Sequence, residues 1–236
     1  MKTWKTTGST TISKVMGGRC NVYLLSNGGK YLLVDTNRKK YRIKLLQNLD
    51  KLKIRRIDAL ILTHTHFDHV ENAAFIQREF GAQVIVHTSE AKFLQDGNTP
   101  LPPGTIPPTK LMMFLLTKRL QSHFAYEACI ADIQADDGFS LRPFGFDARL
   151  MHTPGQSCGM MSVIVEDEIA LVGDAMMGVY PNSIFIPFAE DAEQLIVSWE
   201  KLLTTSCSLF LPGHGSPISR ALVEKCYFRR QVRRKG

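Results

Sequence analysis

A mostly apolar run, IDALILTH at positions 57–64, leads directly into three histidines and an aspartate in the sequence HTHFDH. The run has the length and composition of a buried β-strand. Residues two apart in an extended segment project to the same face, so His64 and His66 can reach one point. Asp68 and His69 follow in the turn. Because imidazole nitrogens and carboxylate oxygens bind zinc and similar ions, the stretch predicts a strand whose exit carries a metal site.

The same arrangement, an apolar strand followed by a polar side chain near small residues, recurs three times. His152 ends the strand pattern in ARLMHTPG, Asp174 ends IALVGD, and His214 lies in LFLPGHG. Loops at strand ends are where a rigid sheet can direct functional side chains, so we expect all three at the site. His87 and His123 are expected outside it, the first as a buried neutral residue and the second within an apolar helical segment.

Two β-rich halves, each followed by helices, predict two sheets packed face to face with helices outside, within a single domain spanning residues 1–236. Strand patterns lie at 10–16, 21–26, 30–36, 57–64, 82–88, 138–144, 146–153, 161–167, 169–174 and 207–213. Helical patterns lie at 41–52, 70–81, 89–97, 191–205 and 217–232.

An insertion at 98–126 interrupts this series with a proline-rich loop, NTPLPPGTIPP, and an apolar helix predicted at 109–126. We expect the helix to pack into the core or to form a homodimer contact. A lid over a binding site is the next alternative, and a helix on a membrane surface is the third.

Bulk composition excludes some classes of protein. No run of 18 apolar residues predicts a transmembrane helix, and the N-terminus lacks the apolar core of a signal peptide, so the expected location is the cytoplasm without membrane contact. The five cysteines form no C-x-x-C pair, which argues against a disulfide framework. The net charge of +7 makes nucleic acid a candidate partner. Part of that charge lies in the C-terminal RRQVRRKG, which is more typical of a solvated helix end.

Taken in order, HTHFDH, HTPG, GD and PGHG resemble the motifs of the metallo-β-lactamase superfamily, over about residues 10–220. The resemblance implies an α/β fold, a four-layered αββα sandwich, with two divalent metal ions, zinc first and iron or manganese as alternatives. It implies one ion on His64, His66 and His152, the other on Asp68, His69 and His214, and Asp174 between them. A bridging aspartate is similar to the glyoxalase II and lactonase-like branch rather than to the true β-lactamases.

The function that this resemblance implies is hydrolysis of a small-molecule ester, thioester or lactone by a metal-bridging hydroxide. Asp68 would also orient the nucleophile and move its proton, and Asp35 would fix a histidine tautomer from behind the metal ligands. The alternatives are a phosphodiesterase or nuclease of the same superfamily, for which nucleic acid would be the partner, and an iron-dependent oxidoreductase. The short chain, which has no interleaved basic and aromatic patch, disfavours nucleic acid, and His66 disfavours the iron enzyme.

Two positions depart from the family pattern. The family often has P-G-H followed by Ser or Thr, whereas this chain has Gln156 and Ser157 after Pro-Gly. We expect metal binding to survive this change and contacts near the substrate to differ. The family's D-T-G is here Asp35-Thr36-Asn37, a mild change because asparagine tolerates left-handed backbone conformations.

Overall fold

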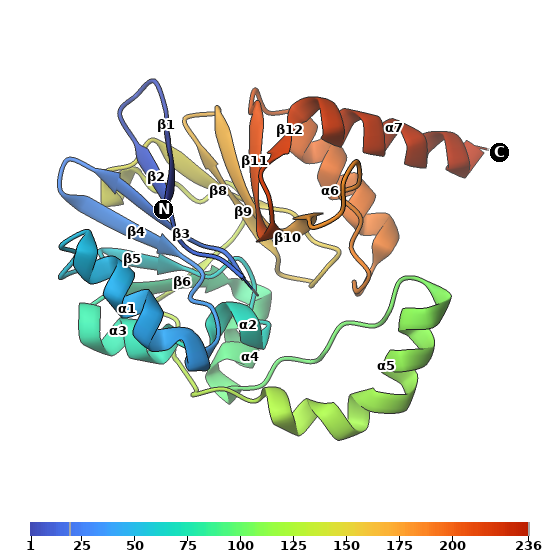
Figure 1. Cartoon of the computed structure of the whole chain (residues 1–236), viewed down its shortest axis with the longest axis horizontal. Helices are drawn as coiled ribbons and strands as arrows, with labels where there is room; N and C mark the ends of the chain where they lie inside the picture. Colours follow the sequence, from blue (N-terminus) through green and yellow to red (C-terminus); the bar gives the residue numbers. More distant parts are fainter. Residues whose placement is uncertain (19, 236) are drawn as a thin grey trace.

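The computed structural model describes residues 1–18 and 20–235, in which two β-sheets pack against each other (Figure 1). The first sheet, in spatial order, contains β1 (Lys2–Lys5), β2 (Thr11–Met16), β3 (Val22–Asn27), β4 (Lys30–Val34), β5 (Ala59–Ile61), β6 (Gln83–His87) and β7 (Ile133–Ala135). The second contains β12 (Ile218–Ser219), β11 (Leu209–Gly215), β10 (Ile169–Gly178), β9 (Met161–Val165) and β8 (Ala148–His152). Pairing is antiparallel from β1 to β4, parallel from β4 to β7, and parallel between β10 and β11.

Helices cover the outer face of each sheet. The first sheet is covered by α1 (Arg42–Lys51), α3 (Ala73–Phe80) and α4 (Ala91–Asp96), and the second by α6 (Ala192–Leu203) and α7 (Arg220–Lys235). The remaining elements are α2 (Phe67–Val70), α5 (Pro107–Leu120) and the 3-10 turns η1 (Lys39–Tyr41), η2 (Thr88–Glu90), η3 (Gln121–Phe124) and η4 (Arg142–Phe144). No helix in the described part of the chain is long and apolar enough to cross a bilayer.

Alternation along the strands divides the buried side chains among three cores. In β3, Leu24 packs under the helices of the first sheet, while its neighbour Leu25 faces the second sheet. In β9, Val163 faces the first sheet and Ile164 packs under α6 and α7. Successive side chains of a strand point to opposite faces, so apolar residues at both positions require cover on both sides. The predicted αββα sandwich is therefore confirmed.

Two predicted strands differ from the structure. The segment predicted as a strand at 138–144 contains η4 instead, because Pro143 has no N–H for a sheet ladder and Gly145 turns the chain at φ 89°. The strand predicted at 57–64 ends at Ile61, since the N–H of Thr63 donates to the Asp35 side chain at 2.9 Å. The histidine motif thus begins where the chain leaves the sheet.

The insertion reaches along one side of the molecule, and Figure 1 shows α5 as an arm beyond the sandwich. It is attached by backbone pairing, with Thr105 N donating to Pro187 O at 2.9 Å and Ala189 N donating to Pro103 O at 3.0 Å. Within 107–115, the described side chains of α5, only that of Met113 is buried. The prediction that this helix packs into the core is therefore wrong. The homodimer contact through 109–126 stays a prediction.

Candidate active site

The predicted ligands come from separate elements that end at one edge of the sandwich. His64 and His66 follow β5, Asp68 and His69 lie on α2, Asp174 lies within β10, and His214 lies within β11. The Nε2 atom of His214 is 3.3 Å from Nε2 of His69, 3.2 Å from Oδ2 of Asp174 and 3.5 Å from Oδ2 of Asp68.

The other two histidines adjoin this group. The ring centroid of His64 is 4.1 Å from that of His69 and 4.7 Å from that of His66. One ligand atom each from His64, His69 and Asp174 lies within 4.8 Å of the others. Six of the predicted ligands therefore form one cluster.

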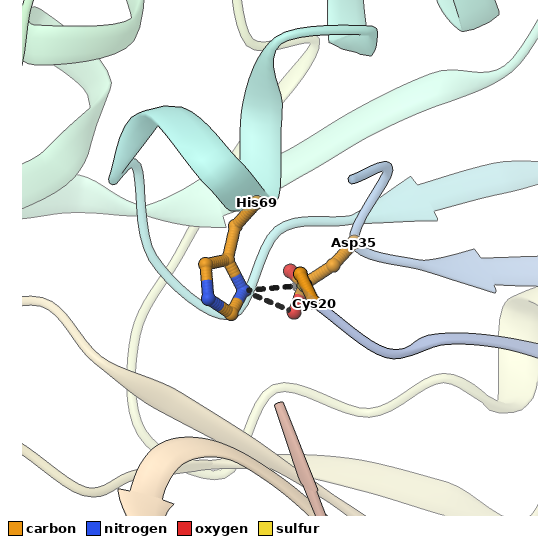
Figure 2. Close-up of side chains that lie close together, drawn as sticks. All are labelled: Cys20, Asp35 and His69. Carbon is orange, nitrogen blue, oxygen red and sulfur yellow. Dashed lines mark hydrogen bonds and ion pairs between the residues drawn. The ribbon is translucent and has the colours of Figure 1, made fainter. Parts of the chain in front are cut away.

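Cys20 and Asp35 lie on the Nδ1 side of the His69 ring (Figure 2), whereas Nε2 of that ring points to the cluster. Nδ1 of His69 lies 2.8 Å from Oδ2 of Asp35 and 3.5 Å from Sγ of Cys20. Burial raises the pKa of the Cys20 thiol to about 12, so the sulfur is neutral at physiological pH. Since a carboxylate only accepts hydrogen bonds, His69 donates from Nδ1 to Asp35, and Nε2 is the ring nitrogen that faces His214 and Asp174. Asp35 thus makes the contact expected of a residue that fixes a histidine tautomer.

Asn37 also supports the loop behind the predicted metal ligands. Its φ of 61° lies in the left-handed region that asparagine was expected to tolerate. The buried side chain donates to the carbonyl of Cys20 and accepts from the backbone of Arg38 at 2.7 Å. Replacement of the family's glycine is therefore accommodated without disturbing the cluster.

Three buried polar atoms at the site have no hydrogen-bond partner among the described residues: Nε2 of His64, Oδ1 of Asp174 and Oε1 of Gln156. Burial lowers the pKa of His64, and the rings of His69 and His66 lower it further, so its imidazole is neutral. Burial opposes the charge on Asp174, but His214 and His69 outweigh it and hold the pKa of this carboxyl well below its ordinary value. These three atoms, an imidazole nitrogen, a carboxylate oxygen and an amide oxygen, are buried without a hydrogen bond and are of the kinds that ligate a cation.

His152, predicted as a metal ligand, does not join the cluster. Its Nε2 is 2.9 Å from the carbonyl oxygen of Cys158, and its ring stacks on His87 with centroids 4.2 Å apart and planes 14° apart. The reason is strand geometry, because His152 is the last residue of β8 and faces the same side as Leu150, toward the neighbouring sheet. The assignment of His152 to the first metal is therefore corrected.

Gln156, four residues further along the loop, occupies the place expected for His152. Its side chain is 4% exposed and its Nε2 lies 3.1 Å from Nδ1 of His66. The departure from the family pattern at this position was noted in the sequence but was expected to concern the substrate alone. The signal that could have placed Gln156 in the cluster is the P-G-Q segment itself, because the chain departs there from its family at a position next to the predicted ligands.

A cavity of about 470 Å³ opens over the cluster. Its floor includes His66, Asp68, Asp174, His214 and Gln156, and its walls are apolar. The insertion supplies Leu101, Met113 and Phe124 to these walls, while Met177 and Phe188 come from the other side. The insertion thus covers the site, which was the second of its predicted roles.

Comparison with known proteins places these observations in a family. The sequence model of the Metallo-beta-lactamase superfamily matches residues 15–214. A Beta-lactamase-like protein 2 homolog of Caenorhabditis elegans is 27% identical over 209 residues, which make up 87% of this chain and 58% of that protein. An Atrochrysone carboxyl ACP thioesterase of Aspergillus fumigatus is 25% identical over 224 residues, 89% of this chain and 58% of that protein. This chain therefore spans less than two thirds of either relative.

Solved structures agree in fold. The BLEG-1 B3 metallo-beta-lactamase has a TM-score of 0.71 with 23% sequence identity, over 91% of this chain and 96% of that one. At this identity the likeness concerns the fold alone. The family match runs from β2 to His214 and so includes the whole ligand cluster. The resemblance in the motifs is confirmed, and the chain belongs to the metallo-beta-lactamase superfamily.

Proposed function

We propose that this chain is a dinuclear metal-dependent hydrolase acting on an ester, thioester or lactone with an apolar acyl part. Membership of the superfamily supports an enzyme of the metal-dependent hydrolase class. The observation that carries the proposal is the set of buried ligand atoms without a hydrogen-bond partner, two of which, on Asp174 and Gln156, belong to residues that line an apolar cavity. The relative named as a thioesterase makes a thioester one of the substrates to test.

Zinc is the first choice for the two ions, and iron or manganese are the alternatives. The ions would be held by the six residues of the cluster, His64, His66, Asp68, His69, Asp174 and His214. When bound, divalent ions lower the pKa of water toward about 7 and polarise a carbonyl oxygen. The chain's own contribution is to fix the ligands, to exclude bulk water with the apolar walls and to keep Asp174 ionised.

Asp68 is the residue that we assign to proton transfer. Its carboxylate lies on the cavity floor, 3.5 Å from Nε2 of His214. In the proposed hydrolysis, the oxygen of water forms a bond to the acyl carbon, and the bond from that carbon to the leaving oxygen or sulfur breaks. Asp68 would accept a proton from the water and deliver it to the leaving atom. The products are a carboxylic acid and an alcohol or thiol.

The apolar walls define which part of the substrate the cavity accepts. The wall residues are hydrophobic, and burying an acyl chain against them gains about 25 cal/mol per Å² of apolar surface. We therefore expect hydrolysis of p-nitrophenyl esters and acyl thioesters to increase from acetyl to hexanoyl. A phosphodiester, bis-p-nitrophenyl phosphate, should be hydrolysed poorly.

The test compares two histidine variants of the purified protein for metal content and for hydrolysis of this substrate panel. His214→Ala should lose at least one metal equivalent and nearly all activity, because it removes a ligand from the centre of the cluster. His152→Ala is the matched control, since its ring stacks on His87 outside the cluster, and it should keep both metal and activity. Wild-type protein without bound metal, or full activity in His214→Ala, would overturn the proposal.

A further inference from the structure

The orientation of Gln156 follows from the hydrogen bonds of His66. Nε2 of His66 is 3.2 Å from the carbonyl oxygen of Pro100, which can only accept a hydrogen bond. The proton of His66 therefore lies on Nε2, and Nδ1 carries a lone pair. The atom 3.1 Å from that lone pair must be the donor, so it is the amide nitrogen of Gln156. The amide oxygen is left buried without a partner.

The backbone around Gln156 is fixed, so this contact is part of the fold. The carbonyl oxygen of Gln156 accepts from Glu190 N at 3.2 Å, and that of Gly155 accepts from Asp191 N at 2.8 Å. Gly155 has φ 130°, and a Cβ there would lie 2.5 Å from the backbone nitrogen of Leu195. The loop is therefore held against the start of α6, and the Gln156 side chain extends from it to His66.

The two halves of the ligand cluster differ in chemistry. Asp68, His69 and His214 supply one carboxylate and two imidazoles, whereas His64, His66 and Gln156 supply no charged group. Asp174 adjoins both halves. An amide oxygen is a neutral ligand of the kind that suits magnesium, calcium or manganese, while imidazole suits zinc. Burial of a second cation near the first needs negative charge, and only the Asp68 half has a carboxylate of its own.

We propose that Gln156 makes the metal centre unequal, so that the half formed by His64 and His66 binds its ion more weakly and fills second. Two effects act together at this half. The amide N–H of Gln156 occupies the His66 lone pair that a cation requires, so binding there costs a hydrogen bond. The side chain then offers only a neutral oxygen in return. This inference rests on the proposed two-metal site and specifies how that site is loaded.

The test is zinc titration of the metal-free protein against a chromophoric chelator, followed by cadmium-113 NMR at one and two equivalents. Wild-type protein should bind one ion tightly and a second at least about 10-fold more weakly, in line with the 10–100-fold effect of changing groups around a bound metal. Gln156→His should tighten the weaker site alone by at least 10-fold. Gln156→Glu, which is nearly isosteric and adds a charge, should do the same if the histidine does not fit.

Gln83→His is the matched control, because Gln83 is exposed on β6 and a histidine there adds a surface ligand away from the cluster. It should leave both affinities unchanged. A wild type that binds a single ion, with a second bound only by the Gln156 variants, is the limiting form of the same result. Two equal tight sites in the wild type, or no change in both Gln156 variants, would overturn the inference while leaving the proposed hydrolase intact. Absence of any bound zinc would instead reject the proposed function.

Discussion

Replacing Asp35 with asparagine should reverse the tautomer of His69. The buried Asp35 carboxylate accepts hydrogen bonds from Thr63 N at 2.9 Å, from Thr63 Oγ1 at 2.9 Å and from His69 Nδ1 at 2.8 Å. Asparagine has one acceptor oxygen, which the two Thr63 donors would take. Its NH₂ would then face Nδ1 of His69, and the ring must move its proton to Nε2 to accept that donor. Nε2, the ring nitrogen that faces His214 and Asp174, would then carry the proton and could not bind a cation.

The structure gives the size of each effect. Hydrogen bonds to a charged group stabilise by about 1.5–3 kcal/mol and neutral ones by about 0.5–1.5 kcal/mol, so Asp35→Asn should lower the free energy of unfolding by about 1–2 kcal/mol. Asp35→Ala would leave two buried donors, the Thr63 N–H and the His69 Nδ1–H, without an acceptor. At about 1–3 kcal/mol each, the cost is about 2–6 kcal/mol. Metal affinity in Asp35→Asn should fall about 10–100-fold.

The assay pairs urea denaturation of the metal-free protein with chelator competition for zinc. Asp58→Asn is the control, since the Asp58 carboxylate also accepts a backbone hydrogen bond, from Tyr31 N at 2.8 Å, but contacts no metal ligand. It should lower stability and leave zinc affinity unchanged. If Asp35→Asn loses stability in the same way and keeps wild-type zinc affinity, Asp35 supports the loop alone and does not set the His69 tautomer.

Two further substitutions test the packing of the site and the pH dependence of stability. Gly213→Ala would place a Cβ 2.5 Å from Oδ1 of Asp174. We therefore expect elemental analysis to find less bound metal, and denaturation to find a free energy of unfolding lower by about 1–3 kcal/mol. A wild-type metal content would contradict this. Burial alone would raise the pKa of Glu166, but hydrogen bonds from Thr10, Thr6 and Gly8 lower this pKa below 4.5. The ionised Glu166 carboxylate therefore stabilises the fold above pH 4.5, and this stabilisation is lost as the pH falls further. Thermal melting between pH 6 and 3 should therefore drop less in Glu166→Gln than in the wild type, and parallel curves would exclude this role.

The sequence predicts the layers and the first half of the site because both depend on local pattern. Alternating apolar residues identify most strands, and the spacing of His64, His66 and His69 is set within one turn of chain. The short edge strands β1, β7 and β12 were missed, since two to four residues carry no period of their own. Their existence depends on pairing with a neighbouring strand, which is a tertiary contact.

The error at His152 has a related cause. A histidine at a strand end was expected to face the site, as His64 does after β5. In β8 the two-residue period instead directs His152 between the sheets, and the following loop carries Gln156 to His66. That path depends on Asp191 and Leu195 of a distant segment, which no local pattern in the loop encodes.

Different segments of the chain supply the predicted metal ligands and the apolar walls of the cavity. Every predicted ligand in the cluster lies on or directly after an element of the sandwich, whereas Leu101, Met113 and Phe124 belong to the insertion. The insertion is joined to the rest near the site by backbone bonds between 103–105 and 187–189, and its first residues bond to the histidine loop through Thr99 and Pro100. The wall side chains of Leu101, Met113 and Phe124 make none of these bonds, so they can change without moving the predicted ligands. Substitutions at these three wall positions should therefore alter the preference for acyl length while metal affinity stays constant. This separation explains why the motifs identify the reaction class and the cluster, while the substrate depends on the one segment that interrupts the family pattern.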